Sequence, residues 1–488
     1  MTNPVTSKSA SGLDGWFELT KRGSTIGREI RGGLVTFFTM AYIIVLNPII
    51  IGTQADKDGN LISGLPIADS ANIGITMGMV AAATALIAGV LTILMGAYAR
   101  FPLALATGLG LNSMLAYTIV PSMTWPQANG LIFWEGVVIL ILVFTGFRKA
   151  VFNAVPRALR SAISVGIGLF IAFIGLYDAG VVRQDPSGGT PTALGIGNLL
   201  KGWPIAIFLI GFGITVLLYV LKVKGAILIS IIFSTVIAII VQYSLSLGTV
   251  TGGDPTGWKL NVPFFAGFQA PDLGLLGRID FIGAFAAGPQ AWLSIIMLIF
   301  SLLLADFFDT MGTIVAVGAE GGLLDDKGNV PHTQEVLVVD SIGAIAGGLG
   351  SVSSNTSYVE SAAGVGDGAR TGIASIVTGI AFLLAIVLSP FINMVPSEAA
   401  APALFFVGFL MMAQVVEIKW DDPEEAIPAF LTISLMPFAY SITTGIGAGF
   451  VSYVLIKAVR GKARELHPLL WVVAAAFLLY FLRGVLPV

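Results

Sequence analysis

The stretch Leu304–Val315 reads LADFFDTMGTIV, and the earlier stretch Leu34–Val45 reads LVTFFTMAYIIV. Both carry a Phe-Phe pair in the same place, and each precedes a similar acidic loop, Asp56–Asn60 (DKDGN) and Asp325–Asn329 (DDKGN). We count seven apolar spans between the two starting points, so the second copy should enter the membrane from the opposite face. Inverted-topology repeats of this kind are typical of secondary transporters.

The composition of the whole chain indicates a membrane protein with many spans. Of 488 residues 11% are charged and 56% are hydrophobic, and the mean hydropathy is +0.91. A soluble domain carries roughly 25% charged residues, so a cytosolic enzyme is excluded. High hydrophobicity and the absence of Cys also exclude a disordered chain and a disulfide scaffold. The net charge of −3 gives no electrostatic basis for binding nucleic acid.

Charged residues separate long uncharged runs, such as Gly32–Ala55, Ser70–Ala99 and Thr371–Ser397. A helix that crosses the hydrocarbon core needs about 20 mostly apolar residues, so most of these runs are expected to be spans. The sequence therefore predicts an all-α polytopic membrane protein. Its two halves, about residues 24–250 and 281–486, should be interleaved in space.

The basic residues predict the orientation in the membrane. Twelve of them fall on the side of the N-terminus and five on the opposite side, which favours a cytoplasmic N-terminus. Residues 417–466 leave two interpretations open. If Ala426–Ile456 is one span, then Arg460, Lys462 and Arg464 lie outside, against the rule. Alternatively, the segment is broken or re-entrant near Pro437 and Thr443–Gly449.

One polar, glycine-rich stretch lies at the third position of each half. Ala106–Asn112 reads ATGLGLN, and Gly348–Ala369 reads GLGSVSSNTSYVESAAGVGDGA. A helix broken near the membrane midplane frees backbone groups that bind polar ligands in transporters. A glycine-lined packing surface explains the first stretch about as well. We favour a binding role for Ser351–Glu360, because helix packing does not require a carboxylate there.

Five acidic residues fall within predicted spans, where a charge is costly and is a functional candidate by default. Asp306 and Asp309 lie three apart on the eighth span, hence on neighbouring positions of one helix. Glu360 lies in the broken tenth span. We expect Glu135, on the fourth span, and Asp340, near the start of the ninth, to be structural at least as readily as functional. Asp309 and Glu360 stand out because each lies in a repeat feature identified on other grounds.

A carboxyl group in a low-dielectric pocket favours its neutral form, which suits a group that takes up and releases a proton. Both Asp309 and Glu360 also accept hydrogen bonds from ring N–H groups, so either one is a candidate for the proton carrier or the ligand clamp. No metal or cofactor site is expected. The chain has no Cys and only His332 and His467, and it lacks the phosphate-binding motif of ATP-driven pumps.

Several motifs resemble one family of transporters. Arg31–Pro48 (RGGLVTFFTMAYIIVLNP) resembles the first helix of the adenine/guanine/hypoxanthine permeases, the azaguanine-resistance-type branch of the nucleobase–ascorbate (nucleobase:cation symporter) family. The resemblance extends over residues 24 to about 485. Its further motifs are Gly108–Asn112 (GLGLN), Asp306–Gly312 (DFFDTMG), Asp340–Gly343 (DSIG) and Ser353–Ser361 (SSNTSYVES).

The resemblance implies fourteen spans in two inverted repeats of seven, with short extended segments breaking helices 3 and 10. Residues 1–23 would form a cytoplasmic tail, and residues 251–280 an extracellular loop. The first repeat, 24–250, would supply core spans 1–4 and gate spans 5–7. The second, 281–488, would supply core spans 8–11 and gate spans 12–14.

The same resemblance implies roles for individual residues. Asp309 and Glu360 match the acidic residues of spans eight and ten that contact the base, although uracil and xanthine relatives have glutamate at the position of Asp309. Asn112 matches an asparagine on span three that affects transport. Backbone groups of Tyr358 and Val359 would face the base, and Thr313 would line the pocket. Asp306 joins Asp309 and Glu360 as a candidate for proton coupling.

The function implied is proton-coupled uptake of guanine, hypoxanthine and adenine across the cell membrane by an elevator-like movement, with Na⁺ not excluded as the coupling ion. The partners expected are the purine base, the lipid bilayer and a second copy of the chain bound through the gate domain. Two alternatives remain. The same fold would carry uracil, xanthine or a small anion, or the chain would be an integral-membrane enzyme acting on a lipid, which the scarcity of His and Cys disfavours.

Overall fold

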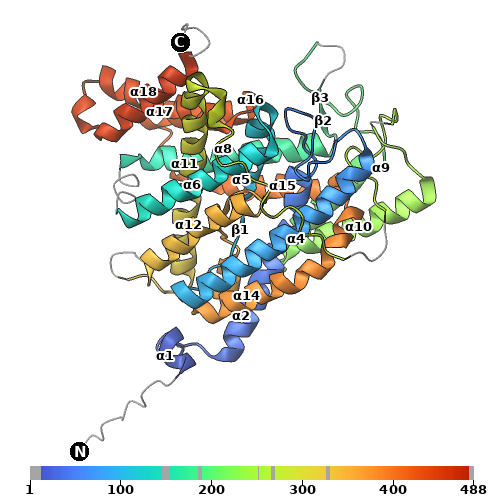
Figure 1. The fold of residues 1–488 in the computed structure, drawn as a ribbon, viewed down its shortest axis with the longest axis horizontal. Coiled ribbons are helices and arrows are strands. Elements are labelled where there is room, and N and C mark those ends of the chain that lie inside the picture. The colour runs from blue at the N-terminus through green and yellow to red at the C-terminus, as the bar shows by residue number, and fades with distance from the viewer. Residues whose placement is uncertain are drawn as a thin grey trace, which may run out of the picture.

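The computed structural model describes residues 12–145, 154–184, 189–250, 252–264, 270–325 and 330–482. Within these ranges nearly all of the regular secondary structure is helical (Figure 1). Parts of the sequence-based predictions lie outside the described residues. They include three basic residues of the topology count (Lys8, Arg148 and Lys149), residues 1–11 of the predicted tail, residues 251 and 265–269 of the predicted extracellular loop, and Asp326–Asn329 of the second acidic loop.

The first half of the chain contains a series of helices and three short strands. Its elements are α1 (Leu13–Phe17), α2 (Ile26–Met40), α3 (Ile43–Ile51), α4 (Ser70–Leu94), the π-helix Met95–Ala99, β1 (Leu105–Thr107), α5 (Leu109–Met114), the π-helix Leu115–Ile119, the 3₁₀ turn Val120–Ser122, α6 (Trp125–Phe144), α8 (Arg157–Asp178), the hairpin strands β2 (Val182–Arg183) and β3 (Ala193–Leu194), α9 (Trp203–Val220) and α10 (Ala226–Leu245).

The second half follows a similar order of helices around one short strand. Its elements are the 3₁₀ turn Phe285–Ala287, α11 (Pro289–Glu320), α12 (Thr333–Leu349), β4 (Asn355–Ser357), α13 (Ser361–Gly366), α14 (Gly372–Ala385), the 3₁₀ segment Ile386–Met394, α15 (Ser397–Met412), the 3₁₀ segment Ala413–Glu417, α16 (Pro423–Phe438), α17 (Ile442–Val459), the 3₁₀ turn Ala463–Glu465 and α18 (Pro468–Leu482).

Polar side chains mark where several of these helices begin. Asp69 accepts a hydrogen bond from the backbone of Ala71 at the start of α4, and Asp422 does the same for Glu424 at the start of α16. Thr124 and Gln127 form a reciprocal capping box at the start of α6. Such caps satisfy backbone N–H groups that have no partner within the helix.

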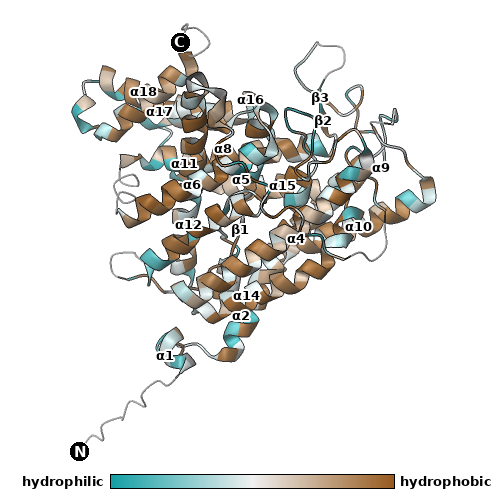
Figure 2. Ribbon diagram, in the orientation of Figure 1, coloured by the Kyte–Doolittle hydropathy of each residue, from teal (hydrophilic) through white to brown (hydrophobic). Residues whose placement is uncertain are grey.

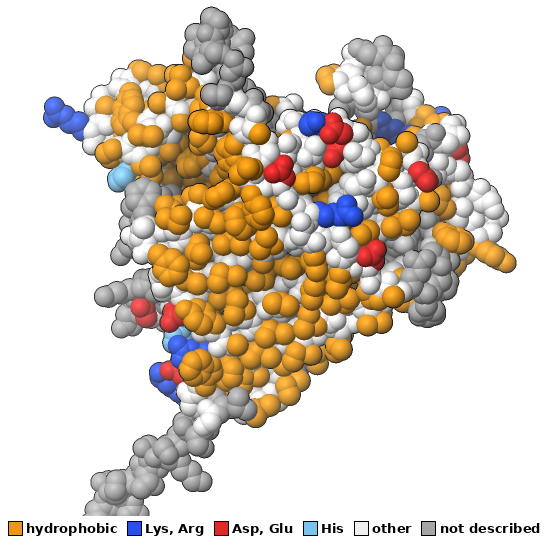
Figure 3. All heavy atoms as spheres, in the orientation of Figure 1, with side chains coloured by type: hydrophobic (Ala, Val, Ile, Leu, Met, Phe, Trp, Pro, Cys, Tyr) orange, Lys and Arg blue, Asp and Glu red, His pale blue; other side chains and the backbone are white. Residues whose placement is uncertain are grey.

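Ten of the described helices are long and apolar enough to cross a membrane. Hydrophobic residues predominate along these helices (Figure 2). The face of the molecule in Figure 3 is a broad hydrophobic surface, with charged side chains gathered beside α1 and toward the opposite edge. This distribution is that of a multi-span membrane protein rather than of a soluble one.

The helices pack into two groups. One contains α2, α3, α4 and α6 with α11, α12, α13 and α14, and the other contains α8, α9 and α10 with α15, α16 and α17. The strands β1 and β4, the helix α5 and the π-helix Leu115–Ile119 pack with the first group. Helix backbones approach closely within each group: a methyl group at Gly372 of α14 would clash with the carbonyl of Gly96, and one at Gly168 of α8 would clash with the carbonyl of Gly408 of α15. Both groups therefore join helices from the two halves of the chain.

Residues 423–459 form two helices rather than one span. α16 ends at Phe438, and α17 begins at Ile442, where the Ser441 hydroxyl accepts a hydrogen bond from the backbone of Thr444. α17 folds back along α16, because Gly445 lies against Thr432 and Gly449 against Pro428. The interpretation of Ala426–Ile456 as a single span is therefore wrong.

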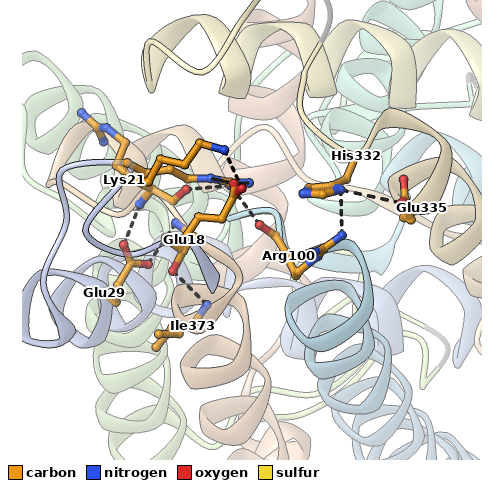
Figure 4. Close-up of polar contacts among 10 residues, drawn as sticks. Glu18, Lys21, Glu29, Arg100, His332, Glu335 and Ile373 are labelled. Carbon is orange, nitrogen blue, oxygen red and sulfur yellow. Dashed lines mark hydrogen bonds and ion pairs between the residues drawn. The ribbon is translucent and has the colours of Figure 1, made fainter. Parts of the chain in front are cut away.

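The N-terminal segment is tied to the first helix group by polar contacts (Figure 4). Hydrogen bonds from Lys21 and then Arg22 lower the pKa of Glu18 to about 2. Arg22 also donates to the backbone oxygens of Arg100 and Arg370. Arg100 in turn lies 2.9 Å from Nδ1 of His332, whose pKa is lowered by burial and by this guanidinium. These contacts hold residues 18–22 against the loops between the helices.

Candidate functional site

Two short strands meet inside the bundle and shape the backbone of the site. β1 and β4 pair antiparallel, with Ala106 opposite Thr356, and both strands are buried. The pairing extends at both ends, where Gly108 N–H donates to the Ser354 oxygen and Tyr358 N–H donates to the Ala104 oxygen, each over 3.0 Å. The two halves of the chain thus exchange backbone hydrogen bonds in the middle of the molecule.

A cavity, here called the central pocket, lies beside this strand pair. It holds about 90 Å³ and is lined by Tyr42, by Gly108–Gly110, by Asp309 and Thr313 of α11, by Ser357–Glu360, and by Val407 and Met411 of α15. The strand pair and α11 belong to the first helix group, whereas α15 belongs to the second. The central pocket therefore lies between the two groups.

Two carboxyl groups reach the central pocket from different elements. Asp309 is exposed to the cavity, although its neighbours on α11 are buried. Glu360 is half-buried just before α13, where its Oε1 accepts a hydrogen bond from the Tyr42 hydroxyl and its backbone oxygen accepts one from Thr39 over 3.4 Å. None of the described residues that line this pocket is basic. The pocket consequently suits a neutral ligand that offers N–H donors, rather than an anion.

The other residues singled out from the sequence fall into two sets. Thr313, Tyr358 and Val359 line the central pocket, and Val359 is half-exposed to it. Asn112 and Asp306 do not line it, and both side chains are fully buried. Asn112 Nδ2 donates to Thr107 Oγ1 over 3.1 Å, so it acts on β1 from behind the site.

Asp306 belongs to a cluster of buried acids behind the pocket. Its acidic neighbours include Asp340 of α12 and Glu135 of α6. Asp340 accepts hydrogen bonds from Thr310 Oγ1 over 2.9 Å and from Ser357 Oγ over 2.9 Å, and so joins α11 to β4. The expectation that Asp340 lies near a helix start is wrong. α12 begins at Thr333, and its Asp340 is fully buried in mid-helix.

A larger cavity, here called the vestibule, adjoins the central pocket and holds about 570 Å³. Asp309, Thr313, Val359, Glu360 and Met411 line both cavities. The vestibule extends to the first turns of α8 and to the 3₁₀ segment after α15. The site is therefore accessible from the end of the molecule at which α8 begins.

Sequence reasoning missed the residues that complete the site. Tyr42, which holds Glu360, lies in the first repeat copy, and its hydroxyl within an apolar run was a usable signal. Ser164 of α8 and Val407 and Met411 of α15 form the opposite wall. No feature of the sequence distinguishes these from ordinary lipid-facing or packing residues.

Many apolar helices, paired short strands at their centre and a polar pocket accessible from one end define a membrane transport protein. Comparison with known proteins agrees. Residues 27–448 match the Permease family (Xan_ur_permease), and the chain belongs to this family.

Among its relatives is the guanine/hypoxanthine permease PbuG of Bacillus subtilis, which is 37% identical over 477 residues that cover 96% of this chain and 99% of PbuG. The adenine permease AdeP of Escherichia coli is 36% identical over 96% of this chain and 95% of its own length. Since these relatives are permeases, the chain is a transporter and not an enzyme.

Solved structures share the fold at much lower identity. The transmembrane domain of the cyanobacterial bicarbonate transporter BicA superposes with a TM-score of 0.58 at 16% identity, over 87% of this chain and 97% of that one. Murine Slc26a9, an anion transporter in its inward-facing state, also gives 0.58, at 12% identity over 93% of this chain and 74% of that one.

Proposed function

We propose that this protein imports purine nucleobases (guanine, hypoxanthine and adenine) by proton symport. The observation that carries this proposal is the pair of carboxyl groups, Asp309 and Glu360, that face one pocket without a basic partner among its described lining residues. Purine rings present N–H and amino donors to such acceptors. The names of PbuG and AdeP support the choice of substrate.

The symport follows from the same pair of residues. A neutral base brings no charge to compensate two carboxylates in a low-dielectric site, so a proton bound with the base lowers the cost of moving the loaded site. Asp309, Glu360 and the buried Asp306 are the candidates for this proton. No cofactor takes part, and Na⁺ is the alternative coupling ion.

The fold suggests how the site is moved. We assign the first helix group as the core and the second as the gate, in two inverted repeats covering 24–250 and 281–488. β1 and β4 are then the breaks in spans 3 and 10. The base moves with the core past the gate, as in an elevator. A homodimer would form through the gate, away from the moving core.

The orientation we propose puts the N-terminus, the start of α8 and the vestibule on the cytoplasmic side of the cell membrane. With α16 and α17 as spans thirteen and fourteen, Arg460, Lys462 and Arg464 return to that same side. The positive-inside rule then holds at the C-terminal end as well. α18 becomes an additional helix beyond the fourteenth span.

Uptake of tritiated hypoxanthine into a host that lacks purine uptake tests the proposal. We expect uptake that rises when the outer pH is lowered, and we expect Asp309→Asn and Glu360→Gln each to lower it by about a hundredfold, as loss of a charged hydrogen-bond partner would. Glu320→Gln, an exposed acid on the same helix as Asp309, is the matched control and should leave uptake unchanged.

Other results would contradict specific parts of the proposal. Uptake of uracil or xanthine without hypoxanthine would replace the substrate. Dependence on Na⁺ at constant pH would replace the coupling ion. Normal hypoxanthine uptake by both Asp309→Asn and Glu360→Gln would remove the site.

A further inference from the structure

The vestibule continues well beyond the space that a purine base needs. Ser164 of α8 lines both the space beside Gly108 and the vestibule, and Arg160, Ser161 and Arg157 line the vestibule farther out. At 1.5 Å per residue, Arg160 lies about 6 Å and Arg157 about 10 Å beyond Ser164 along α8. A ligand that extends from the central pocket along α8 would therefore reach two arginines.

The outer part of the vestibule has a different charge from the central pocket. Arg157 Nε lies 3.4 Å from Glu417 Oε2, and Ser161 Oγ donates to the same oxygen over 2.9 Å. Arg160 and Gln414 complete the wall. Two guanidinium groups thus face one carboxylate. The Arg157–Glu417 pair is largely exposed and so contributes little to stability, and neither arginine lines the central pocket.

We propose that the vestibule binds a purine nucleoside 5′-monophosphate from the cytoplasmic side. This inference rests on the proposed function, since the base would occupy the central pocket between Asp309 and Glu360. The ribose would lie against Ser161, Gln414 and Glu417, and the phosphate would lie between Arg157 and Arg160. The bound nucleotide blocks the site and is not carried, because its phosphate charge cannot follow the base through the bundle.

The chemistry of each part matches the wall that it meets. The planar guanidinium group of arginine pairs with phosphate through two parallel hydrogen bonds. A carboxylate such as that of Glu417 accepts hydrogen bonds from ribose hydroxyls, as acidic residues do in dinucleotide-binding folds. The vestibule volume of about 570 Å³ lies within the range of sites that enclose whole small molecules. Intracellular nucleotides would thereby lower further uptake of bases.

Displacement of tritiated hypoxanthine from the purified full-length protein tests this inference. The competitors are inosine 5′-monophosphate, inosine, ribose 5-phosphate and inorganic phosphate. We expect the nucleotide to displace hypoxanthine at a concentration about tenfold or more below that of inosine, as one charge-assisted contact provides. Free phosphate should not displace it. A nucleotide no better than inosine would overturn the inference, and so would equal displacement by phosphate alone.

Two variants locate the phosphate. Arg157→Gln and Arg160→Gln should each weaken nucleotide displacement by about tenfold, while hypoxanthine affinity stays within about twofold. Arg157→Lys should restore part of the loss. Lys419→Gln removes an exposed charge two residues beyond Glu417 and outside the vestibule lining, and should change nothing. An equal loss in Lys419→Gln, or no loss in the arginine variants, would contradict the assignment.

The same samples separate the two proposals. If the wild type does not bind hypoxanthine, the proposed function fails. If it binds hypoxanthine normally but shows no preference for the nucleotide, only the nucleotide site fails. Vesicles of phosphatidylglycerol added to the detergent solution reveal a lipid headgroup as the phosphate source, and displacement by them would overturn the nucleotide assignment.

Discussion

The two ends of α8 differ in what surrounds them. At its beginning, Arg157, Arg160 and Ser161 line an open vestibule. At its end, the Asp178 carboxylate accepts a hydrogen bond from the Tyr117 hydroxyl over 3.1 Å, and the Tyr117 ring packs edge-on against Tyr440 at 6.0 Å. Tyr117 belongs to the first helix group, whereas Asp178 and Tyr440 belong to the second. One helix thus runs from an accessible site to a seal between the two groups.

This difference identifies the contacts that the proposed elevator movement would have to break and form. If the core moves past the gate, the Tyr117–Asp178 hydrogen bond and the packing of Tyr117 on Tyr440 have to separate before the pocket can be reached from the other side. The vestibule contacts then have to close. In the proposed mechanism the structure corresponds to one of two states. The contacts that distinguish this state lie at the end of α8 around Asp178, here called the closed end.

Locking the closed end should have the largest effect. The chain has no cysteine of its own, so Tyr117→Cys with Asp178→Cys can be joined by a short bifunctional thiol reagent. We expect cross-linking to abolish hypoxanthine uptake, while binding from the vestibule side persists. Each single cysteine variant treated with the same reagent is the control. Full uptake after complete cross-linking would show that this end does not open.

Weakening the closed end should have an intermediate effect. Tyr117→Phe removes a hydrogen bond to a charged group, which contributes about 1.5–3 kcal/mol, and should shift the ratio of the two states by about tenfold. Because the shift would favour the state in which the vestibule is closed, we expect a thiol reagent applied from the vestibule side to modify Ser164→Cys more slowly in the Tyr117→Phe background. Tyr98→Phe, an exposed tyrosine at the end of the π-helix after α4, should leave the rate unchanged. An unchanged rate in Tyr117→Phe would assign the seal to ring packing alone.

The smallest effect concerns Lys259, which lies in the loop over the closed end. Its Nζ donates to the Tyr177 oxygen, and burial lowers its pKa to about 8, against the opposing effect of Asp178 and Glu398. Between this value and the 10.5 of an ordinary lysine, the unfolded chain binds more protons than the folded one, so stability rises with pH.

The test compares melting temperatures at pH 7 and pH 9.5. The wild type should gain on the order of 1 kcal/mol relative to Lys259→Met over this interval. Lys201→Met removes an exposed lysine before α9, and its melting temperature should change between the two pH values by the same amount as that of the wild type. If the wild type instead lost stability relative to Lys259→Met between pH 7 and pH 9.5, the pKa of Lys259 would not be lowered by burial.

Parts of the fold and site followed from the sequence for clear physical reasons. Charges are costly in a membrane, so the few within apolar runs marked Asp309 and Glu360, and the structure places both in one pocket. Glycine and serine within an apolar region marked the stretch that contains β4. The multi-span membrane character followed from hydropathy alone and agrees with the ten apolar helices among the described residues. The transporter class followed from the repeat and the family resemblance and is confirmed by the family match.

Other features depend on packing between helices, which could not be predicted from the sequence. Met411 and Val407 line the pocket only because α15 lies opposite the strands, and their residue types suit any membrane helix. The sequence left the turn between α16 and α17 as one of two interpretations, because Pro437 and Ser441 lie within a continuous uncharged run. Asp340 was expected near a helix start because the polar residues before it are typical of a loop, whereas α12 begins at Thr333 and includes them.

The pairing of β1 with β4 has a consequence for how the protein is made. β1 finds its partner about 250 residues later in the chain. At about 5–20 residues per second, synthesis leaves its backbone groups without that partner for tens of seconds. Because unpaired backbone is costly in lipid, the first half must wait beside the translocation machinery, or in contact with a holding factor, until the second half emerges. Biogenesis should therefore be all-or-none with respect to the two halves, and truncation after α10 should yield a chain destined for degradation.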